Sequence, residues 1–297
     1  MSISAFTSYL EFERNYSKHT ITAYKKDLMD FSGFILEEFD EPTIDHIGYN
    51  LIRSWIVHLV DQGITTRSVN RKVSSLRAYY RFLQKTEQIT ASPLVKHKAL
   101  KTQKKLEVPF SEIEMSKIIQ DIPFSEDFEG MRDKLIIELL YTTGMRRSEL
   151  VNLKRNDIAA DYKTIKVLGK RNKERIIPLL PTLKPFIEHY LEHRNALKSI
   201  QAPAFLFLTK SGSKIYETLV YRTINKYFSL VSPKVKKSPH ILRHTFATHM
   251  LNRGADLNSV KELLGHSSLA STQVYTHNSI AELKKVHLKA HPRNKKD

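Results

Sequence analysis

The 297-residue sequence contains no cysteine, which excludes disulfide bonds, thiolate metal sites and a cysteine nucleophile. It has no apolar run approaching the length of a membrane span, and no signal sequence opens the chain. Acidic residues are few: the sequence has 31 Asp and Glu but 48 Lys and Arg, which gives a formal charge of +17. From these absences we expect a cytoplasmic protein that does not act at a membrane.

The remaining composition is ordinary for a folded, soluble chain. Apolar residues make up 41% and charged residues 27%, and the length is sufficient for two domains with cores of their own. The positive surplus favours a polyanionic partner, because binding releases counterions from the polyanion. Nucleic acid is therefore the leading candidate partner. An acidic membrane surface is the competitor, which the missing apolar span and signal sequence disfavour.

Residues 1–97 are predicted to form a small all-helical bundle. Apolar residues recur at helical spacing in four stretches, which begin near Ile3, Thr20, Ile52 and Thr66. Basic side chains lie between the apolar positions, most densely in the fourth stretch. The candidate DNA-contacting residues of this bundle are Lys25, Arg67, Arg71, Arg77 and Arg81. A solvated surface position fits any one of them equally well, but the excess of one sign favours a DNA-facing surface.

A basic stretch without periodicity, residues 98–107, is predicted to be an exposed linker. It would allow two basic units to close around a duplex as a C-shaped clamp, although a simple flexible tether fits the composition nearly as well. Residues 108–297 form the second unit. Helical patterns there include a strongly apolar one from Arg132 to Thr142 that stops at Gly144. They surround one predicted hairpin, made by 162–167 and 174–179, so we expect a mainly α fold with a small β-sheet, of the α+β class.

Side chains able to meet a phosphate gather in the stretch 238–277. Ser238 and Pro239 predict the start of a helix that ends near Gly254, which places His240 and Arg243 one turn apart. Taken alone, such a pair is more often an ordinary surface feature. The order and spacing of the whole set of candidates therefore carry the hypothesis.

The other candidates lie downstream and upstream of that helix. His266 follows a short predicted helix, from about Asp256 to Leu264, and Tyr275 comes nine residues later. Arg146 and Glu149 lie one turn apart, where a plain surface ion pair is the favoured alternative. Lys170 sits in the turn of the predicted hairpin, where an exposed lysine would be unremarkable by itself.

Four motifs occur in order along the second unit: TGMRRSEL, LGKRNKERIIPL, HILRHTFATHML and LLGHSSLASTQVYTH. Together they resemble the catalytic domain of the tyrosine recombinase (phage integrase) family, most closely the bacterial Xer recombinases. SYLEFERNYSKHTITAYKKDLMDF and RSVNRKVSSLRAYYRFL are similar to that family's helical core-binding domain. Any one motif could arise by chance, whereas the set is specific and extends over almost the whole chain.

The resemblance implies a role for each matching residue. The expected catalytic set is Arg146, Lys170, His240, Arg243, His266 and Tyr275, supported by Glu149. Two guanidinium groups suit the charge that develops on a five-coordinate phosphorus. A tyrosine with a pKa near 10 needs a base, for which His240 is the candidate, and Lys170 is the candidate general acid. His266 would donate a hydrogen bond to a non-bridging oxygen.

No metal and no other cofactor are expected. The sequence has no clustered carboxylates of the kind that divalent ions need in nucleases, and a 3′-phosphotyrosyl link conserves the energy of the cut strand without ATP. Arg171 and Lys173 are further candidate DNA contacts in the hairpin. Arg171 departs from the glycine usual in Xer sequences, and it would stiffen the turn that carries Lys170 or add a contact to the DNA backbone.

The resemblance also implies an assembly on double-stranded DNA at the nucleoid. Four protomers would exchange strands through a Holliday junction, as a homotetramer or together with a second Xer-type recombinase, and a DNA-translocating division protein is a further candidate partner. The C-terminal helix within 280–297 would dock on a neighbouring protomer, with folding on its own domain as the alternative. Competing functions are an integrase of a mobile element, a type IB topoisomerase and a catalytically silent architectural DNA-binding protein.

Overall fold

The computed structural model of the chain describes residues 2–103, 107–169, 173–234, 236–265 and 277–294. The chain separates into two compact units, Met1–Lys105 and Leu106–Asp297, and the division falls inside the predicted linker 98–107. Each unit is described by itself below. Their arrangement as a clamp stays a prediction.

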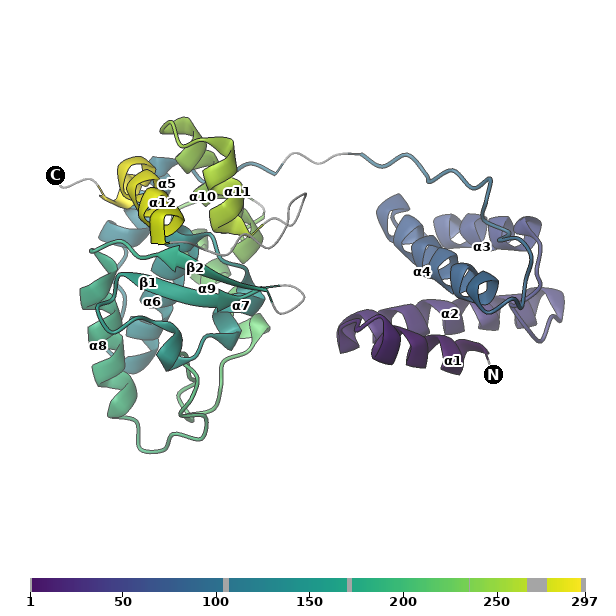
Figure 1. Cartoon of the computed structure of the whole chain (residues 1–297), viewed down its shortest axis with the longest axis horizontal. Helices are drawn as coiled ribbons and strands as arrows, with labels where there is room; N and C mark the ends of the chain where they lie inside the picture. The colour runs from purple at the N-terminus through teal and green to yellow at the C-terminus, as the bar shows by residue number, and fades with distance from the viewer. Residues whose placement is uncertain (1, 104–106, 170–172, 235, 266–276, 295–297) are drawn as a thin grey trace. The chain divides into compact units, whose positions relative to one another are not determined.

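Unit 1 is a helical bundle, as predicted (Figure 1). Its elements are α1 (Ser2–Ser8), the π-helical turn η1 (Tyr9–Glu13), α2 (Lys18–Phe39), α3 (Tyr49–Asp61) and α4 (Thr66–Lys85). Ser17 and Thr65 start α2 and α4, because their side chains accept the backbone N–H of Thr20 and Ser68, each at 3.3 Å. Apolar side chains of these helices, with Trp55 among them, form a core of their own.

A buried carboxylate joins α2 to α4. Asp27 accepts hydrogen bonds from both terminal nitrogens of Arg71, at 2.6 and 2.8 Å, and from the hydroxyl of Ser75 at 2.7 Å. Lys72 adds a longer contact at 3.3 Å. A carboxylate in the interior needs such partners, so Arg71 braces the bundle while half of its side chain still faces solvent.

Part of the predicted tether is bound to unit 1. The side chain of Asn70 bonds both backbone groups of Leu100, at 2.8 and 2.9 Å, and the ring of His97 lies 3.1 Å from the hydroxyl of Tyr49. The predicted linker is exposed at Lys98, Ala99 and residues 101–103, as expected, but Leu100 is bound to α4. An asparagine on a helix can capture loop backbone at long range, which composition does not reveal.

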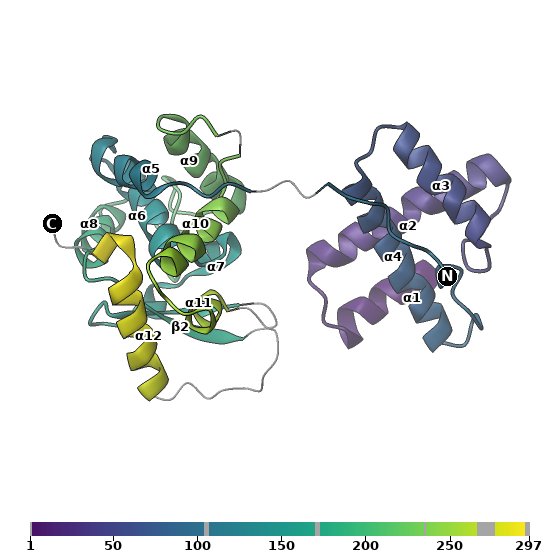
Figure 2. The same cartoon turned by 90° about the horizontal axis from the view of Figure 1, so that it is seen from above.

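Unit 2 is mainly helical with one two-stranded antiparallel sheet, as predicted (Figures 1 and 2). Its first elements are α5 (Glu112–Ser116), η2 (Lys117–Asp121), α6 (Phe128–Thr143), α7 (Arg147–Asn152), η3 (Arg155–Asp157), β1 (Thr164–Leu168) and β2 (Glu174–Pro178). These are followed by α8 (Leu183–Asn195), α9 (Glu217–Ser229), α10 (Pro239–Asn252), α11 (Leu257–Leu264), α12 (His277–Ala290) and η5 (Pro292–Asn294).

Helix α6 is the centre of unit 2. Most of its side chains are buried, and it packs against α7, α8, α9 and α10. It begins at Phe128, four residues before the predicted start at Arg132, because the carboxylate of Asp127 accepts the backbone N–H of Gly130 at 2.8 Å. It ends at Gly144, as predicted, in a left-handed conformation.

The predicted hairpin is present with slightly different limits. Ile165 pairs with Ile177, and Val167 pairs with Arg175. The first strand starts at Thr164 rather than at Tyr162, because Tyr162 has a φ of 57° and belongs to a turn. The two strands carry the chain toward and away from the segment that contains Lys170.

Helices α10 and α11 begin and end close to where the sequence predicts, whereas α12 begins at His277, three residues before the predicted tail pattern at Ile280. Ser238 caps α10 with Pro239 in its first turn, and Asp256 caps α11, accepting from the N–H groups of Asn258 and Ser259 at 2.9 Å. Among the described residues, no helix is both long and apolar enough to cross a bilayer.

The C-terminal helix α12 packs on its own unit, which is the alternative that the sequence left open. Docking of the C-terminal residues on a neighbouring protomer stays a prediction. Leu283 and His287 are buried, and the ring nitrogen Nε2 of His287 lies 2.7 Å from the carbonyl oxygen of Thr142 at the end of α6. Of the apolar side chains at helical spacing along α12, Leu283 is buried and Val286 packs against the core of unit 2, whereas Leu288 is only partly buried. Histidines also hold the helix in place, because they reach carbonyls at the end of α6 that have no partner within that helix.

Candidate active site

Glu149 lies at the centre of a buried cluster of charged side chains. Its Oε1 accepts hydrogen bonds from Nη1 of Arg146 at 2.8 Å and Nη1 of Arg175 at 2.9 Å. Its Oε2 accepts from the backbone N–H of Arg146 at 2.7 Å and from Nη2 of Arg175 at 2.8 Å. Burial alone would raise the pKa of the Glu149 carboxyl, but these bonds outweigh it and hold the pKa below its usual value. The alternative of a plain surface ion pair is therefore wrong.

Arg175 is the residue of this site that the sequence analysis missed. It lies on β2, is 4% exposed, and donates from Nε to the carbonyl of Leu263 at 2.9 Å. One signal could have found it. Strand alternation places Arg175 on the same face as Ile177, and an arginine at a core-facing position requires an acidic partner.

Arg243 is held between the ends of two helices. Its Nη1 donates to the carbonyl of Gly144 at the end of α6, and its Nη2 to the carbonyl of Leu264 at the end of α11, both at 2.7 Å. Carbonyls at a helix C-terminus have no partner within the helix, so the guanidinium completes both ends. Burial, followed by the nearby charge of Arg146, lowers the pKa of Arg243 to about 10, so the group stays charged at neutral pH.

Arg146 and Arg243 meet at the turn that ends α11. Nη2 of Arg146 lies 3.3 Å from the carbonyl of Gly265, next to the Leu264 carbonyl that Arg243 binds. We call Arg146, Glu149, Arg175 and Arg243 the arginine cluster. Three guanidinium groups and one carboxylate leave it with a net charge of +2 (3 − 1), and 35% of the Arg146 side chain is exposed. Forked, partly accessible cations of this kind suit a phosphate.

Three glycines lie beside the arginine cluster. Gly144 and Gly265 both have a positive φ, and a Cβ on Gly265 would lie 3.0 Å from the side chain of Arg175. Gly169, which directly precedes Lys170, also lies against the cluster. A Cβ placed there would be 3.5 Å from Nη1 of Arg175 and 3.6 Å from Oε1 of Glu149.

His240 lies on the first turn of α10, one turn before Arg243, and is largely exposed. Its Nε2 is 3.5 Å from Oε2 of Glu107, which also pairs with Lys236. The hydrogen bond from Lys236 lowers the pKa of Glu107. His240 thus lies on the solvent-facing side of α10. Its acidic neighbour, Glu107, is not a member of the arginine cluster.

Four predicted residues lie outside the described part of the chain: Lys170, Arg171, His266 and Tyr275. Their places in the site stay predictions. Their described neighbours are Gly169 after β1, Gly265 at the end of α11, and His277 at the start of α12.

The predicted DNA contacts of unit 1 are on α2 and α4. The exposed ones are Lys25, Arg67, Arg71 and Arg81, whereas Arg77 is partly buried. Lys173, at the start of the returning arm of the hairpin in unit 2, is also exposed. These positions are accessible, but a single chain does not test their contact with DNA.

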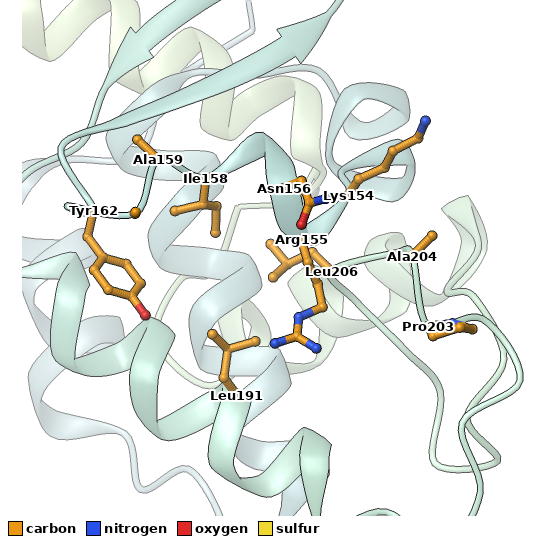
Figure 3. Close-up of a pocket in the computed structure, with 11 residues that line it drawn as sticks. Lys154, Arg155, Asn156, Ile158, Ala159, Tyr162, Leu191, Pro203, Ala204 and Leu206 are labelled. Carbon is orange, nitrogen blue, oxygen red and sulfur yellow. The ribbon is translucent and has the colours of Figure 1, made fainter.

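A separate pocket lies beside the turn η3 and helix α8 (Figure 3). Arg155, Tyr162 and Leu191 are among its lining residues, a different set from the arginine cluster. Within the described ranges, no group of three or more His, Asp or Glu side chains is placed to hold a metal ion.

Comparison with known proteins assigns the class. A model described as "Phage integrase family" matches residues 110–282, and one described as "Phage integrase, N-terminal SAM-like domain" matches residues 3–87. Tyrosine recombinase XerC of Chlorobaculum parvum is 37% identical over 98% of this chain and 94% of its own length. Tyrosine recombinase XerC of Staphylococcus aureus is 39% identical over 99% of this chain and 97% of its own. The chain therefore belongs to the phage integrase family. Within that family it is a Xer-like tyrosine recombinase, a site-specific recombinase.

Solved structures confirm the fold class. The XerH recombinase bound to a palindromic difH substrate superposes with a TM-score of 0.71 at 21% identity, covering 98% of this chain and 82% of that one. The Tn1549 transposon integrase in complex with circular intermediate DNA gives a TM-score of 0.67 at 21% identity, covering 95% and 98%. At these identities the likeness shows the fold, a helical unit followed by an α+β unit.

Proposed function

We propose that this recombinase cuts one strand of double-stranded DNA by attack of the Tyr275 hydroxyl on a phosphodiester whose non-bridging oxygens are bound by Arg146 and Arg243. One observation carries the proposal. The two arginines converge on the turn at Leu264 and Gly265, directly ahead of the segment that contains His266 and Tyr275. A phosphate at the exposed edge of Arg146 would meet both guanidinium groups.

The proposed reaction exchanges one phosphate ester for another. The Tyr275 oxygen forms a bond to phosphorus while the bond to the 5′ oxygen breaks, leaving a 3′-phosphotyrosyl link. His240 accepts the phenol proton, Lys170 gives a proton to the departing 5′ oxygen, and His266 donates a hydrogen bond to a non-bridging oxygen. A 5′ hydroxyl from a second duplex then attacks the link and rejoins the strand, which needs no ATP.

Basic side chains outside the arginine cluster are proposed to bind the phosphate backbone. They are Lys25, Arg67, Arg71, Arg77 and Arg81 in unit 1 and Arg171 and Lys173 in the hairpin of unit 2. Contacts of this kind set position on the duplex and do not read its sequence. The DNA target therefore depends on other side chains.

We propose resolution of chromosome dimers at cell division as the cellular role. The support is that the relatives at 37–39% identity over nearly the full chain carry the name XerC. The active species would be a tetramer on two DNA sites at the nucleoid, homomeric or shared with a second Xer-type recombinase, under a DNA-translocating division protein. Integration of a mobile element is the alternative, with the same chemistry and another target.

A nicked duplex that traps the covalent link tests the proposed chemistry. Wild-type protein should form the adduct, and Tyr275→Phe should bind the duplex without forming it. Arg243→Gln should cleave about 10²–10³-fold more slowly, because it removes a charged contact made to the transition state. Arg253→Gln is the matched control, since Arg253 follows the same helix but pairs with Glu112. An adduct formed by Tyr275→Phe would contradict the proposal.

A further inference from the structure

We infer that Arg175 is a positioning residue for Arg146: by holding Glu149 from the opposite side, it leaves the positive charge of Arg146 available to the DNA phosphate. This inference rests on the proposed function, because it concerns the phosphate-binding part of the same site. It adds a residue that touches neither the DNA nor the reacting atoms.

The geometry shows one carboxylate shared equally by two arginines. Each oxygen of Glu149 accepts one hydrogen bond from Arg146 and one from Arg175, at distances between 2.7 and 2.9 Å. The Nε of Arg175 donates to the carbonyl of Leu263 at 2.9 Å and so fixes the guanidinium to α11. Glu149 therefore has a full set of partners before any substrate arrives.

Of the three side chains Arg146, Glu149 and Arg175, only Arg146 faces solvent to a substantial extent. The side chains of Arg175 and Glu149 are 5% and 3% exposed, whereas that of Arg146 is 35% exposed. Two guanidinium groups and one carboxylate give the trio a net charge of +1 (2 − 1). Without Arg175 the net charge falls to zero, and Glu149 neutralises Arg146 alone. The exposed guanidinium would then offer a phosphate much less favourable electrostatics.

Arg175 also sets the spacing of the site. It lies on β2 and reaches α11, so it connects the hairpin that leads to Lys170 with the turn that leads to His266. A lysine at this position keeps the charge but loses the planar fork, so it cannot reproduce the paired bonds to both oxygens of Glu149. Lys and Gln at position 175 therefore separate the charge of Arg175 from its geometry.

The test compares two substrates with two variants. One nicked duplex carries an ordinary phosphodiester at the cleavage position, and the other carries a methylphosphonate, which lacks the charge of one non-bridging oxygen. Arg175→Gln should cleave the phosphodiester about 100-fold more slowly than wild type, with DNA affinity changed less than about 3-fold. On the methylphosphonate, Arg175→Gln should cleave within about 3-fold of the rate of wild type on that same substrate. The transition state there carries less negative charge and needs less positive charge to stabilise it.

Arg132→Gln is the matched control. Arg132 is another buried arginine paired with a carboxylate, that of Asp133, at 2.9 and 3.0 Å, so its loss also breaks a buried ion pair. It should lower thermal stability and leave cleavage of both substrates unchanged below the melting temperature. Arg175→Lys extends the test if Arg175→Gln does not fold. One ammonium group cannot hold both oxygens of Glu149, so Glu149 would neutralise Arg146 in part. We therefore expect about a 10-fold loss on the phosphodiester and none, relative to wild type, on the methylphosphonate.

Two results would overturn the inference. One is cleavage of the phosphodiester by folded Arg175 variants at the wild-type rate. The other is an equal deficit on both substrates, which would mean that Arg175 does not act through the charge offered to the phosphate. If wild-type protein forms no adduct on either substrate, the proposed chemistry fails instead, so the two failures are distinguishable.

Discussion

Arg243 keeps its charge in a place from which water is largely excluded. Burial and the charge of Arg146 lower its pKa to about 10, which still leaves the guanidinium protonated at neutral pH. The carbonyls of Gly144 and Leu264 replace water around it. Because these dipoles are already oriented, the cation can stabilise a phosphate without reorganising its surroundings.

Gly144 shows how closely α10 approaches the end of α6. We expect Gly144→Ala to destabilise the protein more than Gly254→Ala. Both positions have positive φ, +60° and +81°, so alanine brings a similar backbone strain of about 1–2 kcal/mol. Only at Gly144 would the new methyl meet a neighbour, 2.4 Å from the ring of Phe246, whereas nothing lies within 4 Å at Gly254.

Chemical denaturation measures this difference. Overpacking typically adds about 1–3 kcal/mol, so the free energy of unfolding of Gly144→Ala should lie at least about 1 kcal/mol below that of Gly254→Ala. Equal values for the two variants would argue against the tight contact between α10 and α6.

At the scale of elements, two neutral histidines, one in α12 and one directly after it, hold this helix against the end of α6. Burial lowers the pKa of His287 to about 4, and burial together with the neighbouring His287 lowers the pKa of His291 well below its usual value. Both rings lie against carbonyls near the end of α6, those of Thr142 and Tyr141. Protonation of either ring would place an uncompensated charge in the core.

The stability contributed by these histidines should therefore depend on pH. Below pH 6.5 these histidines become protonated in the unfolded chain but stay neutral in the folded one. Their contribution to the free energy of unfolding is therefore complete above pH 6.5 and is lost as pH falls toward about 4. The loss is about 1.4 kcal/mol per pH unit for each histidine. His287→Gln keeps a donor without titrating there, so its free energy of unfolding should fall less steeply between pH 6.5 and 5.

The exposed Lys289 of the same helix provides the control, since Lys289→Gln keeps both buried rings and should leave the acid sensitivity of the wild type unchanged. A His287→Gln protein with the same acid sensitivity as wild type would show that this ring does not control the docking of α12.

The elements also show which parts of the structure the sequence can predict. Helix starts such as Ser238–Pro239 and Asp256 were correct, because a cap and the helix it starts are neighbours in the chain. Paired charges far apart were not found: Arg175 and Glu149 are separated by 26 positions, and Arg71 and Asp27 by 44. Local periodicity carries no information about such partners, and it treats a buried arginine or histidine as a polar surface residue.

For the whole molecule, the charge of +17 is the property that bears most directly on DNA. Affinity should fall as salt rises, with a slope of about −0.9 in log K against log salt for each phosphate contacted. Arg67→Gln and Arg81→Gln should each reduce that slope by about one. Lys184→Gln, which removes a lysine paired with Glu188 on α8, should leave it unchanged. Unaltered slopes in the two arginine variants would remove them from the DNA surface.

The sequence alone was sufficient for the two-unit organisation and the family, because the motifs occur in a fixed order over nearly the whole chain. It also identified Arg146 and Arg243, which the fold brings to one turn. The clamp and the tetramer depend on DNA and on further protomers, so a single chain cannot determine them.

The central claim is that Tyr275 becomes joined to DNA beside Arg146 and Arg243. The most direct measurement is to trap the protein on a nicked duplex, digest the complex with a protease and identify the modified peptide by mass spectrometry. We predict a nucleotide attached through its 3′ phosphate to Tyr275. Cleavage of the duplex with the phosphate attached to a different residue, or to none, would contradict the account.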